Sequence, residues 1–380
     1  MSGAADASDA GEQAAREAVA GLQGETPALV MVYASIGYDL PQLLKSIRNI
    51  TGEAQLVGAT TAGHFAKGAV QPIGPSGVAV LALSGGKYRF GVASAAQISG
   101  DLDGTGRRLA RETQAAAGRG AYGAILLLTD WLIGDQQRLI QGMYRVTGPR
   151  IPIVGGAAAD MLTMGPTSVF HNDQVLDQGA VAVWISSERP LKVVTEHGWE
   201  PLGVPLLVGR VDGISLQELN GGSAANAYAD VLELPHHAIG DQQEFYPIGL
   251  QHPLAIVQAD GSLLVRAVIG RTPEGGLLTT SEVPAGCAVH VTSGSADGLL
   301  SCIEPLAERV LEDRDDAGVV LAFSCIARAQ VMGERCAEEP LRLQRAAGDV
   351  ATFGFWTYGE YGRTVGVLGT HNATLTALAL

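Results

Sequence analysis

The chain has 380 residues, of which 47% are hydrophobic and 17% are charged, and its formal net charge is −14. This length predicts about two domains with ample apolar material for their cores. The acidic balance argues against nucleic acid as a partner, because phosphates select basic surfaces, and it disfavours anionic membranes.

Residues 1–26 lack a basic start and a continuous apolar stretch, so they do not predict a signal peptide. The alanines after Glu12 and Leu22 indicate a short helix, and we expect a flexible tail before it. No apolar run reaches the roughly 18 residues that a membrane-spanning helix requires. The four cysteines form no CxxC pair, which suits a reducing compartment. We therefore expect a cytoplasmic protein without membrane insertion.

Apolar strand patterns alternate with helical patterns along the rest of the first half. Strands are predicted at 28–35, 55–63, 77–85, 88–95 and 123–130, and helices at 39–50, 101–118 and 135–146. Asp39 is suited to capping the first of these helices. A turn is expected at 152–160, followed by strands around 167–173 and 179–187. Continuous apolar strands beside helices predict an α/β protein with mixed β-sheets flanked by helices.

The order of elements in 88–137 recurs in 287–333, and His171-Asn172 has a counterpart in His371-Asn372. A fainter likeness joins 28–44 to 205–219. A duplication would give two packed halves related by a pseudo-two-fold axis, with a ligand cleft between them. Chance likeness between apolar strands is the alternative.

The polar stretch 230–253 carries three prolines and breaks the hydrophobic periodicity, so it predicts a domain boundary. The expected organisation is a tail with a short helix over 1–26, a first domain over 27–229 and a second domain over 230–380.

Taken in order, several segments resemble the FIST family, which pairs a FIST N with a FIST C domain. The first-half segments are LVGATTAGHFAKG, PIVGGAAAD, HGWEPLG and SLQELNGGSAANAY; the second-half segments are LLVRAVIG, VPAGCAVHV, AFSCIARAQVMG, GFWTYGEYG and THNATLT. The resemblance implies a bacterial intracellular signal-sensing protein, with amino acids proposed as family ligands and haem bound in a nitric-oxide-sensing branch. The family commonly has CSTAGEI where this chain reads ATTAGHF, so Ala59 replaces a cysteine and His64 an acid.

Cys325 follows the apolar stretch 319–324, at the strand edge where open α/β sheets tend to bind ligands. Arg328 and a nearby helix start would favour its thiolate, and Glu360 or His371 could serve as its base. Free cysteines are also commonly small core residues. The sequence therefore leaves open a nucleophile, a ligand-lining residue and a core residue.

Arg328 adjoins an apolar strand end, so its guanidinium must find an acceptor. That acceptor is Glu360 or the carboxylate or phosphate of a ligand, and the two are compatible, since Glu360 could hold the guanidinium in place for a ligand. Glu360 lies among aromatic residues and glycines, and Trp356, Tyr358 and Tyr361 would form a flat-walled pocket around it. A solvated glutamate in a turn is the alternative.

His371 and Asn372 are candidates for the same site, although a histidine at such a point commonly caps backbone groups. Gly155 and Gly156 could offer backbone N–H groups to an anion. Haem ligands would come from His64, His236, His237 or His252, but no CxxCH is present and no zinc spacing occurs. We predict no metal and no resident cofactor, with haem kept as an alternative.

Two functions follow. The first is a sensor that binds a small molecule between its domains and signals through a separate protein, such as a histidine kinase. The second is a hydrolase or lyase acting on a small carbonyl compound, in which Cys325 attacks, Glu360 or His371 moves protons and Arg328 anchors an anionic group. A haem-based nitric oxide sensor is a further alternative.

Overall fold

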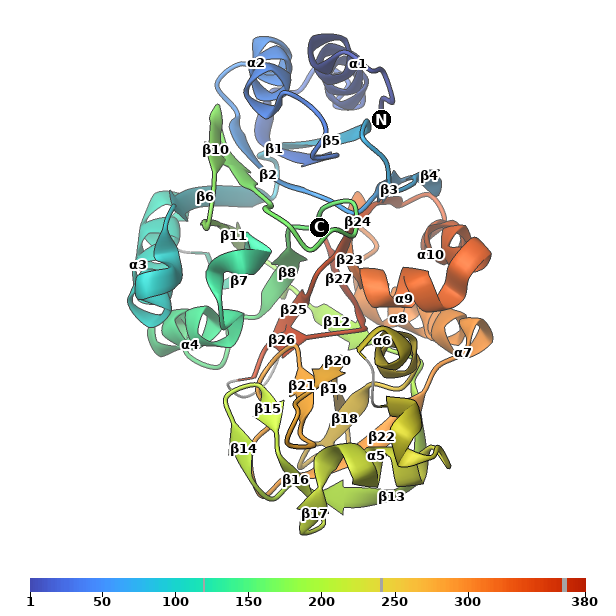
Figure 1. Ribbon diagram of the computed structural model, residues 1–380. Coiled ribbons are helices and arrows are strands. Elements are labelled where there is room, and N and C mark those ends of the chain that lie inside the picture. The colour runs from blue at the N-terminus through green and yellow to red at the C-terminus, as the bar shows by residue number, and fades with distance from the viewer. Residues whose placement is uncertain (119, 240–241, 364–367) are drawn as a thin grey trace.

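The computed structural model describes residues 1–118, 120–239, 242–363 and 368–380. Three mixed sheets turn their inner faces toward one shared apolar core and carry helices on their outer faces (Figure 1). The expected α/β class with flanked mixed sheets is confirmed. No helix in these ranges is long and apolar enough to cross a membrane.

The three sheets are built from one recurring unit: a strand, a helix, a parallel strand, a hairpin and an antiparallel strand. The first unit comprises β1 (Pro27–Ala34), α2 (Leu40–Thr51), β2 (Gln55–Thr60), β3 (His64–Ala66), β4 (Ala69–Gln71) and β5 (Val78–Ser84). The second comprises β7 (Tyr122–Thr129), α4 (Gln136–Thr147), β8 (Ile153–Ala157), β9 (Val169–His171), β10 (Gln174–Leu176) and β11 (Ala180–Ser187). The third comprises β23 (Val319–Cys325), α10 (Glu338–Ala347), β24 (Ala351–Thr357), β25 (Glu360–Arg363), β26 (Thr370–His371) and β27 (Leu375–Ala379).

Further elements complete the sheets and cover them. β6 (Tyr88–Ala95) lies beside β11, and β12 (Val193–Glu196) lies beside β27. The remaining helices of this part are α1 (Ala7–Ala20), α3 (Leu102–Ala117), α7 (Ala296–Ser301), α8 (Ile303–Leu311) and α9 (Ile326–Met332).

The hairpin of each unit pairs with a strand of another unit's sheet. The β3–β4 hairpin pairs with β24, the β9–β10 hairpin with β2, and the β25–β26 hairpin with β8. The exchange ties the two halves of the sequence together, because strands from both halves share two of the three sheets. The repeat thus has three units. The sequence left a two-fold duplication and chance likeness open, and it matched the second and third units but not the first.

A glycine marks the same register position in each unit. Gly58, Gly155 and Gly354 lie opposite Phe170, Tyr361 and Phe65 of the borrowed hairpins. A Cβ at any of these glycines would collide with the carbonyl oxygen of the neighbouring first strand, at Val32, Leu127 or Ala322. This shared constraint supports the equivalence of the units. It also shows which residues of different units occupy equivalent positions.

Three expectations need correction. His171 lies in the first strand of its hairpin and His371 in the second, so the two His-Asn pairs are not equivalent. Residues 205–219 belong to a separate lobe and are no counterpart of β1 and α2. The stretch 152–160 is not only a turn, because apolar packing makes its first part the buried strand β8.

The N-terminal segment packs against the body. One face of α1 is buried on α2, and Gly11 lets the two helices approach closely at Ser46. Ser2 forms a bridge with Val78. The short helix is present as expected, but the preceding residues are held by backbone pairing and do not form the flexible tail that we predicted.

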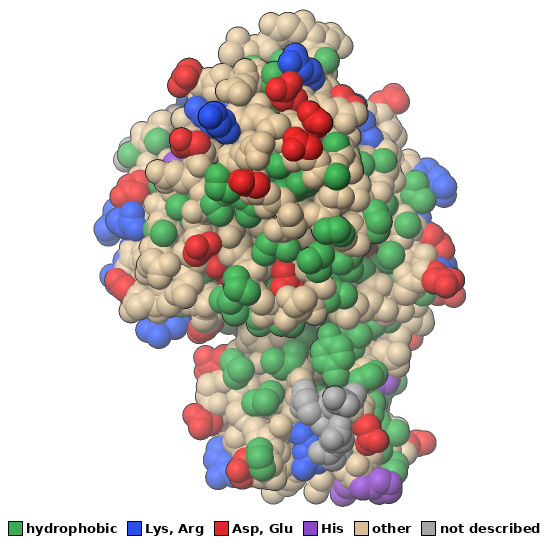
Figure 2. Space-filling model, turned by 45° about the horizontal axis from the view of Figure 1, so that its top comes forward, with side chains coloured by type: hydrophobic (Ala, Val, Ile, Leu, Met, Phe, Trp, Pro, Cys, Tyr) green, Lys and Arg blue, Asp and Glu red, His purple; other side chains and the backbone are tan. Residues whose placement is uncertain are grey.

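A fourth lobe extends below the three sheets in Figure 1 and spans about residues 200–293. Its strands are β13 (Glu200–Leu207), β14 (Val211–Asp212), β15 (Ser215–Leu216), β16 (Glu218–Leu219), β17 (Gly222–Ser223), β18 (Leu254–Val257), β19 (Leu263–Arg266), β20 (Val268–Arg271), β21 (Leu277–Thr279) and β22 (Ala288–Ser293). Two helices, α5 (Ala224–Val231) and α6 (Gln242–Gln251), pack on them. Figure 2 shows the narrowing between this lobe and the larger body.

Candidate functional site

Cys325 ends β23 at the start of α9, and its side chain is buried, with 4% of the residue exposed. Its sulfur lies near the backbone N–H groups of Ala327 and Ala373 and beside the Glu360 carboxyl, but it makes no capping hydrogen bond to the first turn of α9. The backbone N–H of Cys325 donates to Thr374 O at 3.0 Å. This thiol therefore occupies a closed polar corner between two strand ends and a helix start.

The unit register makes Cys325 equivalent to Asp130 of the second unit. Asp130 accepts the N–H of Leu132 at 2.9 Å and that of Gln178 at 2.7 Å, and its own N–H donates to Gly179 O. The cysteine repeats the backbone part of this pattern, because its N–H donates to Thr374 O, but its side chain accepts no capping hydrogen bond from α9. Backbone pairing at this position is therefore common to both units, whereas only Asp130 caps the following helix with its side chain.

Burial, followed by the neighbouring Glu360, raises the pKa of the Cys325 thiol well above its usual value of 9. The thiol is therefore protonated at neutral pH, whereas a nucleophilic cysteine needs the thiolate. The arrangement favours the core interpretation of Cys325 over the nucleophile.

Glu360 begins β25 and is fully buried. Its carboxyl accepts hydrogen bonds from the Thr357 hydroxyl and from both the N–H (3.2 Å) and the hydroxyl (3.0 Å) of Thr374. No Lys, Arg or His forms an ion pair with it among the described residues. Burial raises the pKa of Glu360 to about 8 despite these hydrogen bonds, so the carboxyl is mostly neutral at pH 7.

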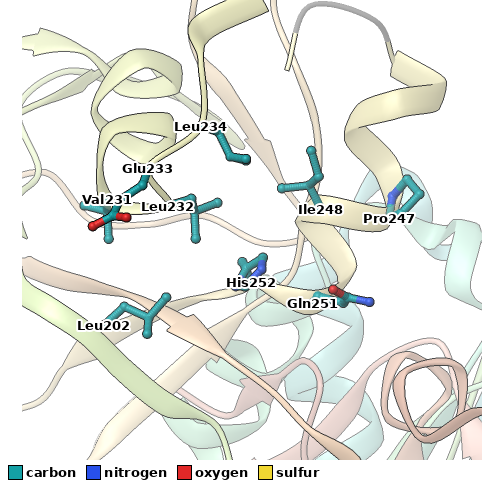
Figure 3. A pocket seen from close by; sticks show the side chains of 9 residues that line it. All are labelled: Leu202, Val231, Leu232, Glu233, Leu234, Pro247, Ile248, Gln251 and His252. Atoms are coloured by element: carbon teal, nitrogen blue, oxygen red, sulfur yellow. The ribbon is translucent and has the colours of Figure 1, made fainter. Parts of the chain in front are cut away.

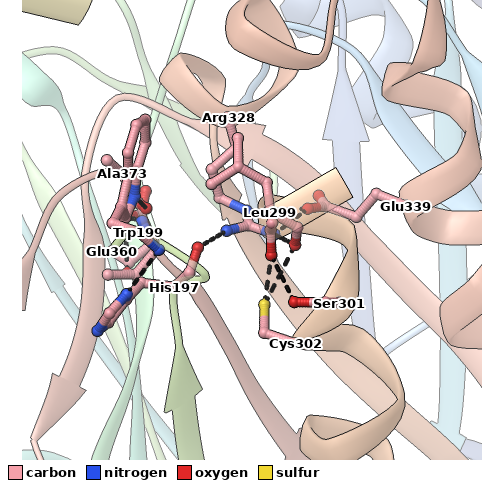
Figure 4. A network of polar contacts seen from close by, with 11 residues as sticks. His197, Trp199, Leu299, Ser301, Cys302, Arg328, Glu339, Glu360 and Ala373 are labelled. Atoms are coloured by element: carbon pink, nitrogen blue, oxygen red, sulfur yellow. Dashed lines mark hydrogen bonds and ion pairs between the residues drawn. The ribbon is translucent and has the colours of Figure 1, made fainter. Parts of the chain in front are cut away.

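Arg328 is also fully buried, but its acidic partner is Glu339 and not Glu360 (Figure 4). Its Nε and Nη2 donate to one Glu339 oxygen at 2.9 and 2.7 Å. The remaining contacts go to the backbone carbonyls of His197 and Leu299 and to the Cys302 sulfur. Burial works against the charge, but Glu339 outweighs it and raises the pKa of Arg328. The guanidinium fork is thus engaged within the protein, and a ligand carboxylate finds no free side of it.

His371 and Asn372 lie beside Glu360 but are also engaged in the fold. His371 is the register partner of Glu360, and burial followed by Arg266 lowers its pKa to about 3. An imidazole with that pKa is a poor base at neutral pH. Asn372 accepts a 2.6 Å hydrogen bond from the Thr280 hydroxyl, which ties it to the lower lobe.

The three aromatic residues do not surround Glu360 as a flat-walled pocket. Trp356, in β24, packs with Ile326 in a small cluster that does not include Glu360. Tyr358 donates to the Asp160 carboxylate, and Tyr361 shares a hydrogen bond with a threonine hydroxyl on the outer face of its sheet. Trp356 and Tyr358 thus share one small cluster, whereas Tyr361 is buried in the cluster beneath α3 and α4.

Gly155 and Gly156 lie in β8, which is paired with β7 on one side and β25 on the other. Gly156 is the register partner of Glu360. Because β8 is an interior strand, its amides belong to the sheet ladders, and this segment is not the anion-binding loop that we expected.

The candidate haem ligands are dispersed. His64 is buried against Thr61, His236 contacts Asp230, and His237 is exposed. Within the described ranges no three His, Cys, Asp or Glu side chains form a group that could hold a metal ion.

His252 lines a surface pocket of about 360 Å³ in the lower lobe (Figure 3), and His236 lines a second one of about 600 Å³ beside α5. The His252 ring lies between Leu232 and Ile248, with Leu234 across the opening. The other lining residues of the His252 pocket are Leu202, Val231, Glu233, Pro247 and Gln251. Apolar walls with a few polar groups at this volume are typical of small-molecule sites.

Fold and site together define an α/β protein whose three interlocked units bury a neutral polar corner and whose added lobe carries a small-molecule-sized pocket. The chain belongs to the FIST family: the FIST N domain model matches residues 28–222 and the FIST C domain model matches residues 224–363. FIST domains are associated with sensing in signal transduction. The pocket lies at the junction of the two matched segments, with Leu202 in the first and its other lining residues in the second.

Relatives extend over the whole chain or part of it. An uncharacterised protein of Mycobacterium tuberculosis is 26% identical over 387 residues, covering 98% of this chain and 96% of its own. An uncharacterised protein of Methanocaldococcus jannaschii is 23% identical over 250 residues, covering 61% of this chain and 47% of its own.

Sequence reasoning missed Glu339, Thr357 and Thr374 at the buried corner and most of the pocket residues. An acid in the helical pattern after Arg328 was a usable signal for Glu339. The threonines and the pocket gave none, because their roles arise only when distant strands and helices meet.

Proposed function

We propose that this protein is a cytoplasmic sensor that binds a small molecule in the pocket between its FIST N and FIST C segments and signals through a separate protein. The pocket carries the proposal: its apolar walls, its volume and His252 suit a small ligand. A histidine kinase or another signalling protein would receive the signal, in keeping with the role associated with the family.

The pocket has a physical route to the body of the protein. Helix α6 ends in the pocket, and it contacts α9, where the Tyr246 hydroxyl reaches Gln330 Oε1 at 3.5 Å. Helix α9 begins at Cys325, beside Glu360. A ligand that shifts α6 would therefore change the packing of α9 over the buried corner.

The enzyme hypothesis has less support. Its nucleophile would be the buried, protonated thiol of Cys325, its base would be Glu360 or His371, and its anchor would be Arg328. All four groups are engaged within the fold. No observation favours the haem-sensor alternative, since the candidate histidines lie apart.

The proposal is tested with a pocket-filling variant. Wild type, Ile248→Trp and the exposed control Leu341→Trp on α10 are screened by thermal shift against small amines, alcohols, carboxylates and amino acids. We expect at least one compound to stabilise wild type and Leu341→Trp but not Ile248→Trp. It should also slow amide hydrogen exchange in α6 and α9. Equal shifts in all three proteins, or no shift with any compound, would contradict the proposal.

A further inference from the structure

Two helices end at the pocket. Helix α5 ends at Val231 and α6 ends at Gln251, and both residues line the pocket (Figure 3). The carboxyl end of a helix carries roughly half a negative charge, because its last carbonyls have no intrahelical partners. Here several of the last carbonyls accept backbone N–H groups, such as Ala229 O from Leu234 and Gln251 O from Gly294, which offsets part of this charge. The two ends together therefore give the pocket a partial negative charge.

His252 adds a hydrogen-bond acceptor. Its Nδ1 lies 3.0 Å from Thr292 O, and since a carbonyl can only accept, Nδ1 must carry the proton. Burial lowers the pKa of His252, so the ring is neutral at pH 7 and its Nε2 has a free lone pair. A ligand that contacts this nitrogen must supply an N–H or O–H group.

Glu233 places a carboxylate at the rim. Its side chain is exposed, and no ion pair to it occurs among the described residues. None of the nine lining residues is Lys or Arg, so no positive side chain of the lining set offsets this carboxylate or the helix ends.

We propose that the pocket selects a small primary amine, an ammonium group on an apolar body, over neutral or anionic molecules of the same shape. This inference rests on the proposed function and names the ligand class of the same pocket. The apolar body lies between Leu232, Leu234 and Ile248, and the ammonium group faces the helix ends, His252 and Glu233.

The test uses three probes with one body and different heads: hexylamine, hexanol and hexanoate. Calorimetric titration of the full chain at pH 7 and low salt should rank them amine, alcohol, acid. The amine should bind about tenfold more tightly than the alcohol, because the two helix ends and the Glu233 carboxylate attract its ammonium group. Glu233→Gln should weaken hexylamine binding about threefold and leave hexanol binding unchanged. The matched control Glu308→Gln, an exposed site on α8, should alter neither.

The outcomes separate the two proposals. Equal affinity for amine and alcohol, or preference for hexanoate, overturns the selection of amines and leaves a small-molecule pocket in place. Failure of all three probes to bind at millimolar concentration overturns the pocket and the proposed function with it. So does equal hexylamine binding by wild type and Ile248→Trp.

Discussion

Replacing Glu360 by glutamine should remove a large pH dependence from the stability of this protein. The native carboxyl holds its proton until a pKa of about 8, because it is buried without a cationic partner. In the unfolded chain the same group releases its proton near its ordinary pKa of 4.5. The stabilising difference is therefore fully present below pH 4.5 and is lost as the pH rises toward 8.

The magnitude follows from the two pKa values. At about 1.4 kcal/mol per pKa unit, keeping this group in the native core costs on the order of 5 kcal/mol above pH 8. The cost at pH 6 is about 2 kcal/mol, so it grows by about 3 kcal/mol between pH 6 and pH 9. Glutamine does not titrate, and its amide can keep the hydrogen bonds to Thr357 and Thr374.

The assay is urea unfolding of wild type and Glu360→Gln from pH 6 to pH 9. Other titrating groups contribute equally to both proteins and cancel in the difference. We expect Glu360→Gln to gain about 3 kcal/mol of unfolding free energy relative to wild type across this range. The exposed control Glu308→Gln should differ from wild type by a constant amount. A constant difference for Glu360→Gln as well would refute a buried, neutral carboxyl.

Two further predictions concern the neighbouring groups. Glu339→Gln should lower the free energy of unfolding by about 3–5 kcal/mol, because it leaves the Arg328 cation buried without its partner, and Arg328→Met/Glu339→Leu should recover most of this loss in urea titrations. If the single variant is as stable as wild type, the pair is not buried as described. Cys325 should react with a maleimide at pH 7 more slowly than Cys287 and Cys336, because its thiol is buried and its pKa is raised. Mass spectrometry of labelled peptides measures the labelling rate of each cysteine. If Cys325 is labelled as fast as the other two, the result would support the enzyme hypothesis.

The sequence by itself determined the class of the fold and most of its local elements. Continuous apolar runs predicted buried strands such as β1 and β23, because a strand covered on both faces needs apolar residues throughout. The acidic residues Asp39 and Asp101 predicted helix starts, and both side chains accept N–H groups of the first helical turn. The position of Cys325 at a strand end was also readable, since it depends only on where the apolar run stops.

Tertiary structure alone decided what these residues touch. Exchange of the hairpins places Glu360 beside β8 and brings Thr374 and Cys325 to its carboxyl, and this depends on strand register across units far apart in the chain. The helical pattern after Arg328 made Glu339 one candidate, but only the tertiary structure selects it as the partner among 39 acidic residues. The pocket at His252 forms where the ends of α5 and α6 lie near Leu202 of β13. Such contacts are long-range, and local composition and periodicity carry no information about them.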